Sequence, residues 1–269
     1  MANLAGISET NRQYLTRLHR RAKGLVDVGE ASTLLDIDRV RAAKLLAQLA
    51  EQGWARRLRR GLYVLIPLEA TSPEDWSEDP WIVAQRVFQP GYVAGWSACE
   101  HWGFTKQIFR DVAVFTAGTI RDRRVTIDQT TYVLRKISDR LLFGTRAAWR
   151  KDTPVQVSDP TRTVVDVLDD PAWGGGIRHV AQIVEAYCSS EHRNDTLLLD
   201  YLDRIGNAAA AKRLGYILEV QGATDQALLD RLRAFVTAGY VQLDPAVPPR
   251  GPFVARWNLR ANVDAKRAG

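Results

Sequence analysis

The stretch GWARRLRRGLYVLIP, residues 53–67, restricts the fold of this chain more than any other part of the sequence. Four arginines fall within five residues, and a run of apolar, strand-forming residues follows at once. WARRL and GLYVLIP are typical of two short β-strands joined through Arg59 and Arg60, with Gly61 opening the second. The residues before this hairpin decide whether it is a solvated charge run or part of a defined fold.

Three helical patterns precede the hairpin. Residues 7–22 repeat apolar side chains at helical spacing, and Thr10 with Gln13 resembles a capping box. Residues 25–38 predict a short extended piece and a short helix, and Asp38 caps a longer helix that stops at a glycine. The order helix, helix, helix, hairpin is that of a winged helix-turn-helix, in which the hairpin is the wing.

The third of these helices divides into an apolar and a polar face. The residues predicted to be buried are Val40, Ala43, Leu46, Ala47 and Ala50. Arg41, Lys44 and Gln48 follow the i, i+3, i+7 spacing of one stripe on the other side. Because the third helix of a winged helix enters the major groove, this stripe predicts contacts with bases.

The excess positive charge of the chain lies in the same region. Residues 1–67 hold 12 Lys and Arg against 6 Asp and Glu, whereas the other residues hold 25 of each, so the whole net charge of +6 belongs to the N-terminal module. A basic module beside a neutral body is typical of nucleic-acid binding, and a charged protein-interaction face is the alternative. We predict a DNA-binding surface made of Ser32, Thr33, Arg39, Arg41, Lys44, Gln48, Arg56, Arg57, Arg59 and Arg60.

The composition changes after the hairpin. Residues 69–80 are acidic and contain two prolines, which indicates a linker. Beyond them, helical and strand patterns mix up to Asp159, an expected N-cap, and a helix-rich half follows; the closing segment RGPFVARWNLRANV alternates as a strand. The sequence thus predicts an α+β fold class with a winged helix-turn-helix domain at 1–68, an acidic linker at 69–80, and a larger mixed α+β domain at 81–269.

The sequence offers no strong sign of catalysis. Its histidines and its two cysteines, Cys99 and Cys188, have no spacing typical of a zinc site, and no phosphate-binding loop is present. The glycines 174–176 precede a helix, where amides can hold an anion, but a tight turn is the simpler interpretation. With no secretory signal and no long apolar run, we expect a cytoplasmic protein with free thiols, no cofactor, no metal and no membrane contact.

With these motifs placed, the chain resembles the AbiEi-type antitoxins of bacterial toxin–antitoxin pairs over nearly its whole length. The resemblance begins at RRGLYVLIPLEA and continues through EDPWIVAQRVFQPGYVAGWSACEHWGF, which holds a Pro-x-Tyr-x-x-x-x-Ser-Ala run followed by Trp-Gly. It extends through LLFGTRAAW, VSDPTRTVVDVLDDPAWGGGIRHV, AAKRLGYILE and LDPAVPPRGPFVARWNLRANV. The order of these motifs is more specific than any one of them.

The resemblance implies a transcriptional autorepressor that binds inverted repeats in its own promoter. It also implies a nucleotidyltransferase-like toxin, which the C-terminal domain counteracts through direct binding or indirectly, and it implies no catalytic motif. The absence of a heptad run predicts a monomer in solution, with two copies on an inverted repeat. The recurrent residues, which become candidates for an antitoxin surface, are Ser97, Glu100, Asp159, Arg162, Asp166, Arg178 and Arg213.

Two other functions fit the sequence. One is a nucleic-acid-processing enzyme that uses the winged helix to bind its target. Its candidate catalytic residues would be Asp159, Asp166 and Asp169. A ligand-sensing transcription factor would instead hold a small-molecule pocket in its second domain.

Overall fold

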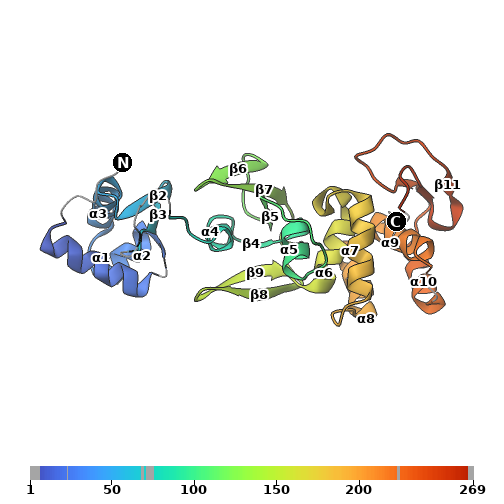
Figure 1. Cartoon of the computed structure of the whole chain (residues 1–269), viewed down its shortest axis with the longest axis horizontal. Helices are drawn as coiled ribbons and strands as arrows, with labels where there is room; N and C mark the ends of the chain where they lie inside the picture. Colours follow the sequence, from blue (N-terminus) through green and yellow to red (C-terminus); the bar gives the residue numbers. More distant parts are fainter. Residues whose placement is uncertain (1–6, 23, 68–69, 71–75, 223–224, 266–269) are drawn as a thin grey trace. The chain divides into compact units, whose positions relative to one another are not determined.

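A computed structural model describes residues 7–22, 24–67, 70, 76–222 and 225–265. The chain divides into two compact units. The first comprises Met1–Val83 with Thr126–Thr130 and Trp149–Pro154, and the second holds the rest. Half of the expected linker at 69–80, namely residues 69 and 71–75, lies outside the described residues. Helices and sheets together confirm the α+β fold class (Figure 1).

The beginning of the first unit has the winged-helix order. Its elements are α1 (Glu9–Arg21), β1 (Leu25–Asp27), α2 (Val28–Leu35), α3 (Arg39–Glu51), β2 (Ala55–Arg59) and β3 (Leu62–Leu65). β3 is the central strand of an antiparallel sheet β1-β3-β2, and α3 contacts both α2 and β2. Arg60 and Gly61 form the hairpin turn, where the φ of 78° at Gly61 favours glycine.

The leucines of α3 decide which of its faces is buried. Its buried residues are Ala42, Leu45, Leu46 and Leu49. Leu46 alone belonged to the predicted set, and Val40 is 65% exposed. Leucine side chains remove more apolar area from water than alanine side chains, so the helix turns its leucines toward the core that it shares with α1 and α2. The predicted polar stripe is exposed as expected.

Two helix caps differ from the prediction. Ser8 has the extended backbone of an N-cap, and its hydroxyl accepts the amide of Asn11. Thr10 already lies inside α1, so it cannot begin a capping box with Gln13. A capping box does form at α2, where the side chains of Asp27 and Glu30 each accept the other's amide.

A second, larger sheet has six strands in the order β6-β7-β5-β4-β9-β8. They are β4 (Gly91–Val93), β5 (Val112–Thr116), β6 (Arg124–Ile127), β7 (Thr130–Lys136), β8 (Thr145–Arg150) and β9 (Thr153–Ser158). Asp128 and Gln129 form the turn between β6 and β7, both with positive φ. The sequence did not predict β4, which is only three residues long, or β8, an edge strand whose exposed side chains break any apolar run.

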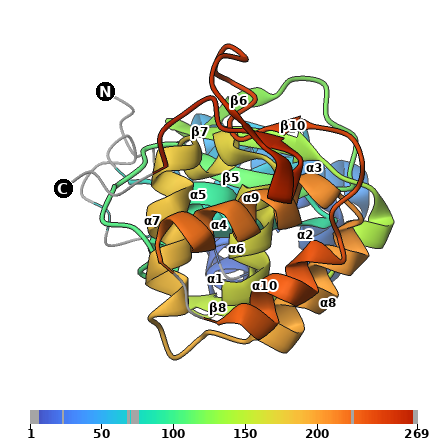
Figure 2. The ribbon, with the colours of Figure 1, turned by 90° about the vertical axis from the view of Figure 1, so that its right-hand side faces the viewer.

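Helix α6 lies at the centre of the helical part. The helices are α4 (Pro80–Val87), α5 (Gly95–His101), α6 (Pro160–Asp169), α7 (Ile177–Cys188), α8 (Asp195–Ile205), α9 (Ala208–Val220) and α10 (Gln226–Arg233), with short 3-10 turns η1 (Asp139–Leu141) and η2 (Pro171–Gly174). α6 contacts α5, α7, α8 and α9, and its residues 160–168 are all buried (Figure 2). Asp159 caps it by accepting the amide of Arg162 at 2.8 Å, as predicted.

The C-terminal segment does not form the single strand that its alternation predicted. It forms β11 (Phe253–Val254), the 3-10 turn η3 (Ala255–Trp257) and β12 (Leu259–Arg260), which joins β10 (Val241–Gln242) in a sheet β10-β12-β11. The turn brings Trp257 into the core, where it is fully buried against α9. A Cβ atom on Gly215 would lie 2.2 Å from the indole ring, so only glycine fits there.

We expect Gly215→Ala to destabilise the protein, because the added methyl group forces the buried indole to shift. Overpacking of this kind costs about 1–3 kcal/mol, partly offset by the higher helix propensity of alanine. Chemical denaturation followed by tryptophan fluorescence measures the change. Gly239→Ala is the matched control, because nothing lies within 4 Å of its added carbon; equal stability of the two variants would contradict the packing argument.

Candidate nucleic-acid interface

Helix α3 exposes a mixed basic and apolar face. Arg41, Lys44 and Gln48 are exposed, and Val40 lies on the same side of the helix because it precedes Lys44 by one turn. The prediction that Val40 lies in the core is wrong. Methyl groups beside basic side chains match the major-groove edge of an A·T pair, where the thymine methyl lies beside hydrogen-bonding groups.

The wing concentrates three charges near its tip. Arg57, Arg59 and Arg60 are exposed, and a β-bulge interrupts the register between Arg57 and Arg59. Such a bulge re-aims side chains that a regular strand would alternate between its two faces. These three arginine side chains are therefore exposed to solvent.

Arg56 is placed differently from the other wing arginines. Its side chain is only 28% exposed, and its Nη2 lies 2.5 Å from the carboxylate of Asp128 and 2.6 Å from the carbonyl oxygen of Trp76. All three residues belong to the first compact unit. A guanidinium held by a carboxylate is already neutralised, so Arg56 does not suit the phosphate contact predicted for it.

Two further predicted contacts are occupied within the winged helix. The hydroxyl of Ser32 donates to the carbonyl of Ile37 at 2.6 Å, and that of Thr33 donates to Gly29 at 3.1 Å. Neither hydroxyl therefore has a spare proton for a phosphate. Arg39 is exposed, and its guanidinium nitrogens lie 3.7 Å from the position of a Cβ on Gly29 of α2. The basic and amide side chains of the predicted surface that are exposed are Arg39, Arg41, Lys44, Gln48, Arg57, Arg59 and Arg60.

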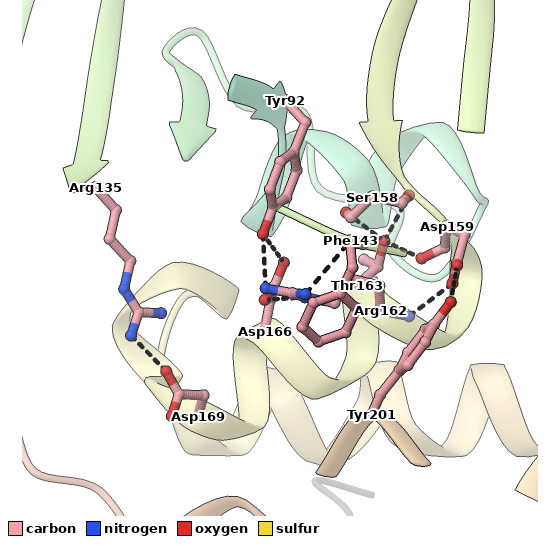
Figure 3. Close-up of polar contacts among 10 residues, drawn as sticks. All are labelled: Tyr92, Arg135, Phe143, Ser158, Asp159, Arg162, Thr163, Asp166, Asp169 and Tyr201. Carbon is pink, nitrogen blue, oxygen red and sulfur yellow. Dashed lines mark hydrogen bonds and ion pairs between the residues drawn. The ribbon is translucent and has the colours of Figure 1, made fainter. Parts of the chain in front are cut away.

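The second unit buries most of the residues proposed as an antitoxin surface. Arg162, 1% exposed, donates from Nε to Asp166 at 2.7 Å, from Nη2 to the hydroxyl of Tyr92 at 2.8 Å, and from Nη1 to the carbonyl of Phe143 at 3.2 Å (Figure 3). Tyr92 in turn donates to Asp166 at 3.3 Å. These contacts join β4, α6 and the loop before β8 into one closed polar network.

Burial acts on each titratable group of this network. Burial, and then the charge of Asp166, raise the pKa of Tyr92 well above its ordinary value, so the phenol stays protonated and can donate. Burial lowers the pKa of Arg162, but the charges of Asp166, Tyr92 and Asp159 raise it overall, so the guanidinium stays charged. Burial also raises the pKa of Asp166, and the charge of Arg162 opposes this rise. Every strong donor here has an acceptor inside the protein, which is the arrangement of a structural network.

The other candidates also have structural partners. Asp159 accepts from the hydroxyl of Tyr201 at 2.7 Å, and Ser97 accepts the amide of Ala113 at 3.0 Å. Arg213 is 3% exposed and donates to the main-chain carbonyls of Leu168, Asp169, Gln242 and Leu243. The surface prediction is therefore wrong for Ser97, Asp159, Arg162, Asp166 and Arg213, because burial and internal bonds occupy them. Glu100 and Arg178 are exposed, although Arg178 donates to the carbonyl of Asp264 at 3.3 Å.

The three candidate catalytic carboxylates, Asp159, Asp166 and Asp169, do not form a shared site. Asp169 pairs with Arg135 and accepts from Asn207 at 2.6 Å, whereas Asp159 and Asp166 have the separate partners described above (Figure 3). In the part of the chain that the structure describes, no three His, Cys, Asp or Glu side chains are grouped to hold a metal ion. Two-metal chemistry needs carboxylates that converge, so these three residues are not arranged for that mechanism.

The triple glycine forms a turn. The amides of Gly175 and Gly176 donate to Ala172 and Pro171, and both residues have positive φ. The carbonyl of Gly174 lies 2.6 Å from Nδ1 of His179. Because the two amides are already bonded, they are not available to an anion.

A cavity of about 200 Å³ lies between the start of α6 and the loop before α8. Its lining includes both signs of charge, from Arg146, Asp159, Glu191 and Arg193. Pockets for drug-sized ligands are usually larger and mostly apolar. The cavity therefore gives the ligand-sensing alternative little support.

Both cysteines are free thiols, with Cys99 buried and Cys188 half-buried. Burial raises the pKa of each thiol, which favours the unreactive protonated form. Among the residues described, no helix combines the length and the hydropathy needed to cross a membrane.

Removing one member of the buried pair should unfold the second unit more easily. We expect Arg162→Ala to cost about 3–5 kcal/mol, because it leaves the carboxylate of Asp166 buried without its partner. Arg178→Ala, at an exposed position, should change stability by about 0.5 kcal/mol or less. Guanidinium unfolding followed by circular dichroism compares them. Equal midpoints would show that Arg162 is not the structural residue described here.

Comparison with known proteins gives a likeness of fold. No protein-family model matches the chain, and no curated protein matches its sequence. Among solved structures, the crystal structure of the RV2827C protein from Mycobacterium tuberculosis is similar, with a TM-score of 0.63 over 96% of this chain and 93% of that one. The two sequences are 18% identical, so the likeness concerns the fold alone.

Proposed function

We propose that this protein is a DNA-binding transcriptional repressor of its own promoter and the antitoxin of a toxin–antitoxin pair. The observation that carries the DNA-binding half is the exposed basic surface of a winged helix, formed by the stripe on α3 and the tip of the wing. We propose that α3 enters the major groove and that the wing arginines contact phosphates or the adjacent minor groove.

Charge distribution supports duplex DNA as the partner. The whole excess positive charge lies in the winged helix, and the rest of the chain is neutral. Each phosphate neutralised by an arginine releases counterions, so this surface gains affinity from DNA in a way that a neutral protein partner would not reproduce. Gln48 and Lys44 add hydrogen-bonding groups suited to adenine and guanine edges.

The antitoxin half of the proposal depends on the sequence resemblance. The exposed candidates that remain are Glu100 at the end of α5 and Arg178 at the start of α7. We propose that a nucleotidyltransferase-like toxin is opposed through the second unit. The charges at these two positions are the first to test for it.

The double variant Arg57→Ala/Arg59→Ala should bind the gene's own promoter more weakly than the parent. Its plot of log affinity against log salt should be shallower by about two, because about one unit of slope goes with each lost phosphate contact. Electrophoretic mobility shift or anisotropy at four KCl concentrations measures this slope.

Controls for this experiment come from the same chain. Arg231→Ala, at an exposed position on α10, should leave both affinity and slope unchanged. Lys44→Ala should instead lower the preference for promoter over random DNA, since base contacts carry sequence information. A wing variant with the parent's slope would remove the wing from the interface.

Co-expression with the gene adjacent to this one, which we propose encodes the nucleotidyltransferase-like toxin, tests the antitoxin half. We expect the parent to restore growth, and Arg57→Ala/Arg59→Ala to do so equally when its gene is driven by an unrelated promoter. Glu100→Ala/Arg178→Ala should restore growth less well at equal protein levels. Growth inhibition that the parent fails to relieve would refute the antitoxin role while leaving DNA binding intact.

A further inference from the structure

Two aromatic side chains lie side by side on the outer face of the C-terminal sheet. Tyr240 is 53% exposed and Phe253 is 56% exposed, with ring centroids 4.8 Å apart and planes at 72°. Phe253 on β11 is directly opposite Arg260 on β12, whose guanidinium carbon lies 4.1 Å from the centre of its ring. β11 is labelled in Figure 1 and β10 in Figure 2. We call Tyr240, Phe253 and Arg260 the aromatic platform.

The alternation of the strands builds this exposure. Leu259 next to Arg260 is fully buried, and Trp257 fills the core beneath the same segment. Val254 next to Phe253 packs partly against that core. Since successive side chains on a strand point to opposite faces, anchoring Leu259 and Val254 inward fixes Arg260 and Phe253 outward. Adjacent exposed aromatic side chains held in this way indicate an interaction site.

The platform is positively charged. Arg260 donates to the carbonyl of Pro249, a neutral acceptor, and Arg250 beside that residue is exposed. Arg256 differs, because Glu219 lies 2.7 Å from it and neutralises it. The charge that contacts Phe253 is thus an arginine, and its complement is an anion with flat apolar groups.

We propose that the aromatic platform binds single-stranded nucleic acid. Bases stack on Tyr240 and Phe253 and on the guanidinium plane of Arg260, while Arg250 and Arg260 contact the phosphates. Unpaired bases have the exposed faces that stacking requires, whereas a duplex hides them. This site is separate in chemistry from the basic face of the winged helix, which suits a duplex groove.

Fluorescence anisotropy on the full chain tests the site with labelled 12-nucleotide oligo-U RNA and oligo-dT DNA and with a promoter duplex. We expect Tyr240→Ala/Phe253→Ala to weaken binding of a single strand by about tenfold or more, with duplex affinity unchanged. Arg57→Ala/Arg59→Ala should do the reverse. A loss confined to oligo-U assigns the platform to RNA, and an equal loss on both strands assigns it to single strands in general.

Two further variants serve as controls for loss of stacking and for loss of exposed apolar surface in general. Phe253→Trp keeps a stacking surface and should retain binding. Ile108→Ala removes an even more exposed apolar side chain elsewhere and should change nothing. Unchanged single-strand affinity in the Tyr240/Phe253 variant, or no single-strand binding by the parent, overturns the proposal. A variant that lowers only self-association in sedimentation also overturns it and assigns the platform to a contact between copies.

Discussion

The ion pair between Arg162 and Asp166 is the interaction on which the second unit depends. Both residues lie on α6, one turn apart, and both are almost fully buried. A charge in the interior is tolerated only when it is paired and its remaining donors are bonded. The hydroxyl of Tyr92 and the carbonyl of Phe143 supply those bonds, so the requirements of one arginine tie the sheet, the loop before β8 and the central helix together.

The buried ion pair changes how the recurrent polar residues of the family resemblance are interpreted. In a sequence, Asp159, Arg162 and Asp166 look like a surface for a partner or the carboxylates of a catalytic site. In the fold, they cap and brace α6, and their charges are satisfied within the protein. Polar residues that the interior already uses are poor candidates for recognition, which leaves the exposed charges of the winged helix as the best-supported interface.

The predictions that succeeded depend on local physics. Neighbouring residues were enough to predict helix caps such as Asp38 and Asp159 and the order of helices before the hairpin. The predictions that failed needed contacts between distant segments. The rotation of α3 depends on the core made with α1 and α2, and the pairing of Arg56 depends on Asp128, which is 72 residues away.

The sequence by itself determined the winged helix, the α+β class and the location of the excess charge, because composition, capping and spacing act within a few residues. Only the tertiary structure decided which polar side chains remain for a partner. It buried Arg162 and Arg213, engaged Arg56 and left Arg57, Arg59 and Arg60 in solvent. It also exposed Tyr240 and Phe253 together, since the turn that buries Trp257 sets the faces of the strands around it. Burial and pairing are properties of the whole packed chain, and no local pattern contains them.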